Sequence, residues 1–195
     1  MSRVTDPQKI ESVRRAAMEI IVEYEYRGTS IGSIAKKAGV SMGYLYRYYS
    51  SKEMLLEDLI NQNLSDVKND IATHLKKSQT IHEFFYNLIS LLFRLAKEDA
   101  IRSQMVATIL LDADFDKVLS QSDLRLKEEV FEGIIKLSKE TNEIREDITE
   151  DDIILTIMTI PFRYIMMKIK EQNYEQYFQE EHILKIEKLC INALR

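Results

Sequence analysis

The chain has 195 residues, enough for one large domain or two small ones, and 45% hydrophobic with 30% charged residues is an ordinary globular composition. Only 5 Gly and 2 Pro occur, which argues against a strand-rich fold because such folds need many turns. The net charge of −5 alone would argue against binding to nucleic acid. The charge is unevenly distributed, however. Residues 1–52 carry nine basic and five acidic residues, a net charge of +4, and the remainder carries 18 basic and 27 acidic residues, a net charge of −9. This asymmetry is typical of a DNA-binding module attached to an acidic body.

Helical spacing of apolar residues continues through the whole chain. In chain order, the expected helices cover residues 7–27, 31–38, 42–49, 51–76, 81–95, 101–111, 117–141, 151–171 and 174–193. Capping side chains precede most of them, and these are Asp6, Ser30, Ser41, Ser50 (with Glu53 at capping-box spacing), Thr80 and Thr149. Gly28 and Asn142 stand where helices can end in a left-handed conformation, and residues 112–116 form a polar break.

We therefore expect an all-α fold of about nine helices, with no confident strand. Residues 1–52 would form a three-helix head for DNA binding, and residues 53–195 a helical domain for effector binding and dimerisation. The helix at residues 51–76 would connect the two domains.

Residues 31–50 have the pattern of a helix-turn-helix, in which two short helices cross steeply over a tight turn. Ala35 is small enough for the crossing, and Gly39 suits the turn four positions later. Val40 and Leu45 can face back toward the first helix. The whole set of residues, with its two capping serines, indicates a helix-turn-helix much more specifically than one small residue followed by a glycine would.

The second helix of this motif is unlike a core helix. Tyr44, Tyr46, Arg47 and Tyr48 would crowd an exposed surface, and tyrosine hydroxyls and arginine bind phosphate well. Gly43 lets the backbone approach a groove, and the helix N-terminus carries a partial positive charge. We therefore expect this helix to lie on DNA.

The alternative is that these tyrosines contribute only to the hydrophobic core of the small head and do not contact DNA. For Tyr49 we favour packing, and for Tyr46 packing and phosphate contact can coexist because tyrosine has an apolar body and a polar tip. For Tyr44, Arg47 and Tyr48 we favour DNA contact.

Residues 10–60 resemble the N-terminal domain of the TetR/AcrR family of transcriptional regulators. The residues that carry the resemblance are Gly28-Thr29-Ser30-Ile31, Ile34-Ala35, Ala38-Gly39-Val40-Ser41, Gly43 with Leu45-Tyr46, and Tyr49 with Lys52-Glu53 and Leu55. The resemblance covers about a quarter of the chain and is highly specific. Tyr49 departs from the more usual Phe, and Gly32-Ser33 stands where polar helix formers are common.

The resemblance implies an all-α homodimer whose C-terminal domain binds a small effector. It also implies a set of DNA contacts, namely Thr29, Ser30, Met42, Gly43, Tyr44, Tyr46, Arg47, Tyr48 and Lys52. Such a dimer would act on double-stranded DNA at a palindromic operator, as a repressor that the effector releases. An activator, or a regulator controlled by a protein partner, is the alternative.

The expected helix at residues 151–171 is apolar on nearly every side, which predicts burial on every side. In a protein of this size, that favours packing on its own core and on a second subunit, together with the helix at residues 174–193. The alternative is a central helix of a monomer. Pro161 removes a backbone hydrogen bond and bends the helix, which can open a ligand site or fit the interface.

An apolar effector pocket can be built from aromatic and methionine side chains of the C-terminal helices, although each of them can equally be plain core. The candidates are His82, Phe85, Tyr86, Phe93, Met105, Met158, Phe162 and Met166. The effector itself cannot be named from these residues.

An enzyme is disfavoured, because the chain has no glycine-rich phosphate loop, no zinc-protease helix and no nucleophile elbow. The three histidines, His74, His82 and His182, lack metal-ligand spacing, so we expect neither metal nor cofactor. One cysteine, no signal-peptide pattern and no apolar run longer than residues 153–162 favour a cytoplasmic protein that does not enter the membrane.

Overall fold

The computed structural model describes residues 7–111 and 121–195, apart from the side chains at 26, 64–68 and 121–127. All regular structure in these residues is helical, which confirms the all-α fold. The elements are α1 (Pro7–Gly28), α2 (Ile31–Ala38), α3 (Met42–Tyr46), α4 (Lys52–Lys77), α5 (Ile81–Glu98), α6 (Ala100–Leu110), α7 (Gln121–Thr141), α8 (Glu150–Lys168), the 3-10 helix η2 (Tyr174–Phe178) and α9 (Glu180–Leu194). The expected polar break at 112–116 and the start of the helix expected at 117 lie outside the described residues.

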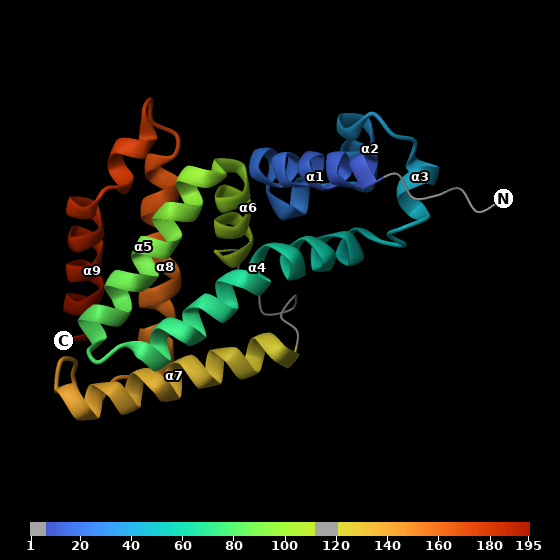
Figure 1. The fold of residues 1–195 in the computed structure, drawn as a ribbon. Helices are drawn as coiled ribbons and strands as arrows, with labels where there is room; N and C mark the ends of the chain where they lie inside the picture. Colours follow the sequence, from blue (N-terminus) through green and yellow to red (C-terminus); the bar gives the residue numbers. More distant parts are fainter. Residues whose placement is uncertain (1–6, 112–120) are drawn as a thin grey trace.

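The helices form two groups (Figure 1). We call α1, α2 and α3 the head, and α5 with α7, α8 and α9 the body. Helix α4 runs from the head to the body, and α6 lies between them, packed against α1. No helix in the described part of the chain is long and apolar enough to span a bilayer.

The cap expected at Asp6 lies outside the described residues, and four of the other expected caps are present. In each of the four cases the cap side chain accepts the backbone amide three residues later, and these caps are Ser30, Ser41, Thr80 and Thr149. The cap expected at Ser50 is wrong. Ser51 has the extended backbone of a cap and accepts the Met54 amide at 3.3 Å, so α4 begins one residue later than the capping-box spacing suggested.

Helix α3 is shorter than the expected 42–49. It ends at Tyr46, after which the Tyr48 and Tyr49 amides both bond to the Leu45 carbonyl at 2.9 Å. The chain therefore closes into a tight turn before α4.

The last expected helix, 174–193, is interrupted. Gln179 has an extended backbone (φ −104, ψ 171) and separates η2 from α9. This break lets Phe178, which is 1% exposed, pack in the body against Phe93, with ring centroids 4.9 Å apart. Periodicity alone could not distinguish η2 from a turn of α-helix.

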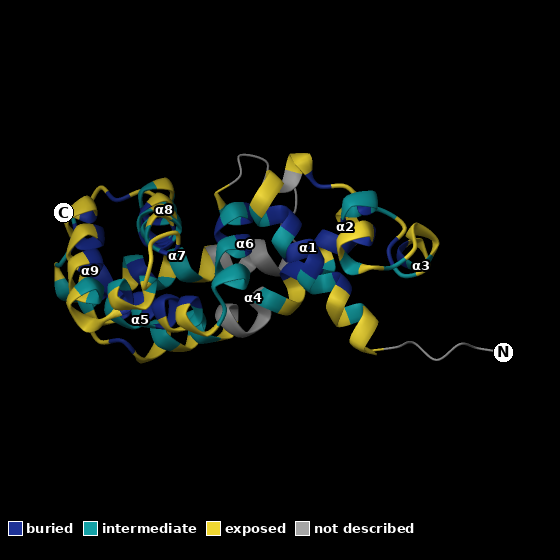
Figure 2. Cartoon of the chain, turned by 90° about the horizontal axis from the view of Figure 1, so that it is seen from above, coloured by how far each residue is buried: buried dark blue, intermediate teal, exposed yellow. Residues whose placement is uncertain are grey.

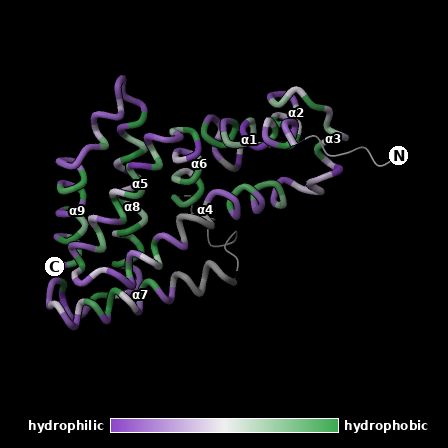
Figure 3. The backbone as a smooth tube through the Cα atoms, in the orientation of Figure 1, coloured by the Kyte–Doolittle hydropathy of each residue, from purple (hydrophilic) through white to green (hydrophobic). Residues whose placement is uncertain are grey.

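Two hydrophobic clusters hold the molecule together (Figures 2 and 3). The head cluster contains residues of α1 and α2, then Leu45 and Tyr49, and continues into α4 as far as Ile60. Met105 and Ile109 of α6 complete it. The body cluster is formed mainly by α5, α7, α8 and α9. The core of the head thus extends beyond residue 52, and α4 and α6 belong physically to both ends.

Candidate functional site

The helix-turn-helix is built as its sequence suggests. Gly39 closes α2 with φ +67, a left-handed conformation that glycine adopts without strain, and the Val40 amide bonds to the Ala35 carbonyl at 3.0 Å. Ile34, Ala35 and Leu45 are 1%, 2% and 0% exposed. The inner face of the motif is therefore fixed by packing in the head cluster.

The outer face of α3 is open. Met42 is 49% and Tyr46 is 51% exposed, and Arg47 is exposed beside them. At Gly43, a Cβ atom would meet nothing within 4 Å, so the backbone itself forms the surface. Figure 2 shows α3 and the adjacent loop largely exposed at the end of the head. Ser30, at the start of α2, is also exposed.

Other expected contact residues turn inward. Thr29 is 5% exposed, and its hydroxyl donates to the Glu25 carbonyl at 2.8 Å. Tyr44 and Tyr48 are half-buried with ring centroids 5.1 Å apart, and the Tyr44 hydroxyl oxygen is buried. Lys52, at the start of α4, is half-buried. Within α3, Tyr46 is exposed as expected, whereas Tyr44, which we expected to be exposed beside it, is half-buried.

The positive charge of the motif is unevenly available. Lys37 lies 3.2 Å from Glu19 and 3.7 Å from Glu23 of α1, and its hydrogen bond to Glu19 raises the pKa of Lys37. Its charge is therefore largely balanced by α1. Lys36, beside it on α2, and Arg47, after α3, are exposed.

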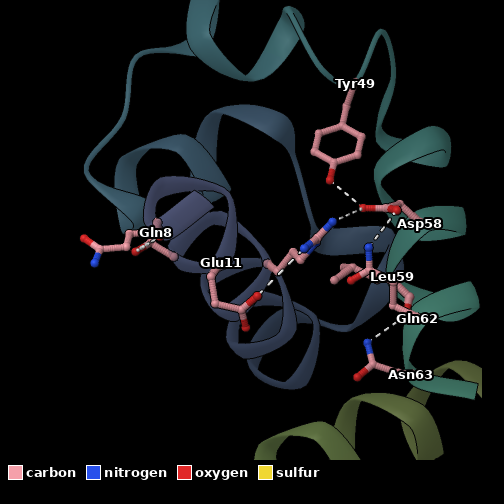
Figure 4. Close-up of polar contacts among 9 residues, drawn as sticks. Gln8, Glu11, Tyr49, Asp58, Leu59, Gln62 and Asn63 are labelled. Atoms are coloured by element: carbon pink, nitrogen blue, oxygen red, sulfur yellow. Dashed lines mark hydrogen bonds and ion pairs between the residues drawn. The ribbon is translucent and has the colours of Figure 1, made fainter. Parts of the chain in front are cut away.

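The head is bonded to α4 through Asp58. Tyr49 is 7% exposed, as expected for a packing residue, and its hydroxyl donates to the Asp58 carboxylate at 2.5 Å (Figure 4). Arg14 of α1 lies 3.4 Å from the same oxygen. Burial, followed by the bond to Asp58, raises the pKa of Tyr49 to about 12. The hydroxyl therefore remains a donor at neutral pH.

The head is bonded to α6 through Asp99. Arg15 of α1 donates to both oxygens of Asp99, at 2.9 and 2.7 Å, and Asp99 caps α6 by accepting the Arg102 amide at 3.0 Å. Burial raises the pKa of Asp99, but the hydrogen bonds from Arg15 and Arg102 and the Arg15 charge outweigh burial and leave it below the ordinary value of 3.8. Sequence reasoning missed both bridges because their partners lie 44 and 84 residues apart and follow no helical spacing.

The eight expected pocket residues have different surroundings in the described part of the structure. Phe85 and Phe93 are buried in the body cluster, and Met105 belongs to the head cluster, against α1. His82 faces α9, where its imidazole pairs with the Glu187 carboxylate. Tyr86, Met158 and Met166 are half-buried and Phe162 is 7% exposed.

Described residues of α4 border two hollows. A cavity of about 30 Å³ between α4, α5, α6 and α8 is lined by Asn63, Leu92, Leu95, Arg102, Ser103, Val106, Phe162 and Ile165. An open groove of about 540 Å³ runs between α4 and α7. Phe162 alone of the eight expected residues is in the lining of either hollow. The groove is walled by Leu75 and Val130, with three glutamates and two lysines in its lining.

The outer faces of α8 and α9 expose large apolar side chains. These are Leu155 (61%), Met167 (56%), Leu184 (51%) and Leu189 (47%). Helix α8 is therefore not buried on every side within one chain. Pro161 is buried and lies inside α8, which continues to Lys168.

Within the described residues, no three His, Cys, Asp or Glu side chains gather as a metal site would require.

Comparison with known proteins agrees with the geometry of the head. The family model for bacterial regulatory proteins of the tetR family matches residues 13–59. The fatty acid metabolism regulator protein of Bacillus subtilis (strain 168) is 28% identical over 144 residues, which cover 67% of this chain and 68% of that protein. The transcriptional regulator BetI of Vibrio atlanticus (strain LGP32) is 33% identical over 76 residues, 39% of this chain and 36% of BetI.

The fold as a whole is also shared. The transcriptional regulator FadR from Bacillus subtilis, crystallised in complex with stearoyl-CoA, superposes with a TM-score of 0.67 at 20% identity, over 95% of this chain and 100% of that one. These relatives are regulators of transcription and not enzymes. Residues 13–59 therefore form a DNA-binding domain of the tetR family of bacterial regulatory proteins, and the chain as a whole shares the all-helical fold of solved regulators of that family.

Proposed function

We propose that the protein is a dimeric, sequence-specific regulator of the cytoplasm, a repressor that leaves a palindromic operator when a small apolar effector binds. The observation that carries the proposal is the open outer face of α3, where Met42, Tyr46 and Arg47 surround a backbone left bare by Gly43. A surface of this kind can enter the major groove of DNA.

The side chains of this surface have different tasks. Arg47 and the Tyr46 hydroxyl contact phosphates, which fixes the position of α3 on the duplex. Met42 and Gly43, in the first turn, approach base edges. Ser30, Tyr48 and Lys52 border this surface. The hydroxyls of Thr29 and Tyr44 face the head. Thr29 therefore contacts DNA through its backbone, and Tyr44 contacts it through the edge of its ring.

Two copies of the chain join through α8 and α9. These helices pack on each other, and each exposes large apolar side chains on its outer face. Large exposed apolar side chains on two neighbouring helices favour an interaction site there. A second copy would bury both faces in a four-helix interface and place two recognition helices on one side of the DNA. The mass in solution tests this, since a monomer at micromolar concentration would contradict it.

The effector enters between α4, α5, α6 and α8. The cavity there holds about 30 Å³, far below the ~300–1,000 Å³ of ligand pockets, so a ligand must push helices apart. The helices around it include α4 and α6, the two elements that also complete the head cluster. Opening the cavity would therefore move the head and change the spacing of the two recognition helices.

A fatty acyl chain is the effector that the relatives favour. One relative is named for fatty acid metabolism, and the FadR neighbour was crystallised with stearoyl-CoA. Leu92, Val106 and Phe162 offer an apolar wall for such a chain, and Arg102 offers a cation for an anionic end. Adding stearoyl-CoA to a protein–DNA complex should release the DNA, while coenzyme A alone should not. Equal release by both, or by neither, would contradict an acyl effector.

A further inference from the structure

The carboxylate of Asp58 joins the turn after α3 and helix α1 to its own helix, α4. It accepts the Tyr49 hydroxyl at 2.5 Å on one oxygen, and Arg14 of α1 lies 3.4 Å from that same oxygen. Its other oxygen accepts the Gln62 amide at 3.0 Å. Figure 4 shows the Tyr49 ring reaching from the turn after α3 toward Asp58 on α4. The turn after α3, α1 and α4 therefore meet at one side chain.

Helix α3 needs such an anchor. It has five residues, too few for a helix to be stable by itself, so tertiary contacts set its direction. Leu45 and Tyr49 are the residues that bury its inner side. The Tyr49 amide also bonds to the Leu45 carbonyl, so the place of Tyr49 sets the place of the last turn, which carries Tyr46 and Arg47.

The hydroxyl contributes what the ring cannot. Ring burial would hold Tyr49 in the head cluster, but apolar contact is non-directional and permits small rotations. A hydrogen bond to a carboxylate is short, directional and about twice as strong as a neutral one. Because Asp58 lies on α4, this bond ties the turn after α3 to α4 in a definite direction.

We propose, on the basis of the proposed DNA-binding function, that Tyr49 is a positioning residue whose hydrogen bond to Asp58 holds α3 at the angle to α4 that DNA binding requires. The same bond carries movement of α4 to the recognition helix. Tyr49 itself lies inside the head and touches no DNA.

The test uses the full chain and the duplex that it enriches from a random pool. Tyr49→Phe keeps the ring and removes the hydroxyl, so the protein should fold while its DNA affinity falls about ten-fold, the loss of one hydrogen bond to a charged group. The salt dependence of binding should stay unchanged, because no phosphate contact is lost. Tyr164→Phe is the matched control, since the Tyr164 hydroxyl bonds to His182 at 2.7 Å in the body, far from α3. It should lower thermal stability without changing DNA affinity.

A double-mutant cycle separates positioning from simple stabilisation. Asp58→Ala should weaken DNA binding at least as much, and Tyr49→Phe should have no further effect in that background. The proposal is overturned by equal DNA affinity of Tyr49→Phe and wild type well below their unfolding temperatures, or by additive losses in the cycle. A wild-type protein that enriches no duplex would instead contradict the proposed function itself.

Discussion

Among the described residues, a surface of the head and a surface of the body both expose large apolar side chains, and their surroundings differ. At the head, Met42 and Tyr46 lie on a five-residue helix beside Gly43 and Arg47. At the body, the exposed residues lie on α8 and α9, two long helices packed on each other, and are Leu155, Met167, Leu184 and Leu189. The first surface combines the Arg47 cation, the exposed backbone at Gly43 and the Tyr46 hydroxyl, which suits a negatively charged duplex. The second sets leucine and methionine side chains among exposed charged residues, including Arg163, Lys185 and Lys188, and we propose that it takes another copy of the chain. Exposed apolar area therefore identifies a partner only together with its neighbouring charges.

The two surfaces are linked by few elements. Helix α4 carries the chain from head to body, and α6 touches α1 through Met105, Ile109 and the Arg15–Asp99 bridge. Because the proposed dimer must place two heads on one DNA molecule, the distance between the two surfaces matters as much as their chemistry. Breaking either surface, or either link, should have different and separable effects.

The largest effect should come from the body surface. Leu155→Glu combined with Leu189→Glu places unpaired charges in the proposed interface, and burying such charges is costly. The protein should sediment as a monomer and lose the advantage of two linked heads, about 100-fold or more in DNA affinity. Leu111→Glu, at an exposed leucine at the end of α6, is the control and should leave both properties unchanged. A double variant that remains dimeric would show that the interface lies elsewhere.

A smaller effect should come from the head surface. Arg47→Ala should weaken binding to every duplex about ten-fold and reduce the slope of log K against log salt by about one, because one phosphate contact is lost. Arg94→Ala removes an exposed arginine from α5 and should change neither quantity. Unchanged salt dependence in Arg47→Ala would place α3 away from the phosphates.

The link through α6 can be tested by stability. Asp99→Ala removes the cap of α6 and the partner of Arg15, and should lower the free energy of unfolding by about 1 kcal/mol. The ion pair adds little to this because both side chains are about a third or more exposed. Chemical denaturation would measure the loss, and a variant as stable as wild type would contradict the role of Asp99.

The pH dependence of Asp99 has a definite sign. Its native pKa lies below 3.8, so its contribution to stability is complete above pH 3.8 and disappears as the pH falls through the native value. Asp99→Asn can still cap α6 but carries no charge. The difference in free energy of unfolding between Asp99→Asn and wild type should therefore be present at neutral pH and vanish in acid. A difference that grows as the pH falls would reverse the assignment.

The smallest effect should come from the crossing of α4 and α7. A Cβ atom at Gly133 would lie 2.5 Å from the end of the Leu75 side chain, so Gly133→Ala crowds the contact while improving helix propensity. The net loss should be about 0.5 kcal/mol. In a Leu75→Ala background, the same substitution should become stabilising. Thermal unfolding of the four proteins decides, and the same sign in both backgrounds would contradict the crowding.

Local signals predicted the local structure well. Ser30, Ser41 and Gly39 define the helix-turn-helix through caps and a turn that depend on neighbouring residues alone. The sequence could not show that Tyr44 turns inward while Tyr46 points outward, because α3 is too short for periodicity to define a face. Nor could it place Met105 against α1 or His82 against Glu187, since these contacts depend on how distant helices pack.

Selection of random duplexes by the purified protein tests the central claim most directly. If α3 reads DNA from each half of a dimer, the enriched sequences will contain an inverted repeat with half-sites about one helical turn, ~34 Å, apart, and Arg47→Ala will bind them more weakly. Enrichment of no sequence, or of a single asymmetric site bound by one copy of the chain, would contradict the account.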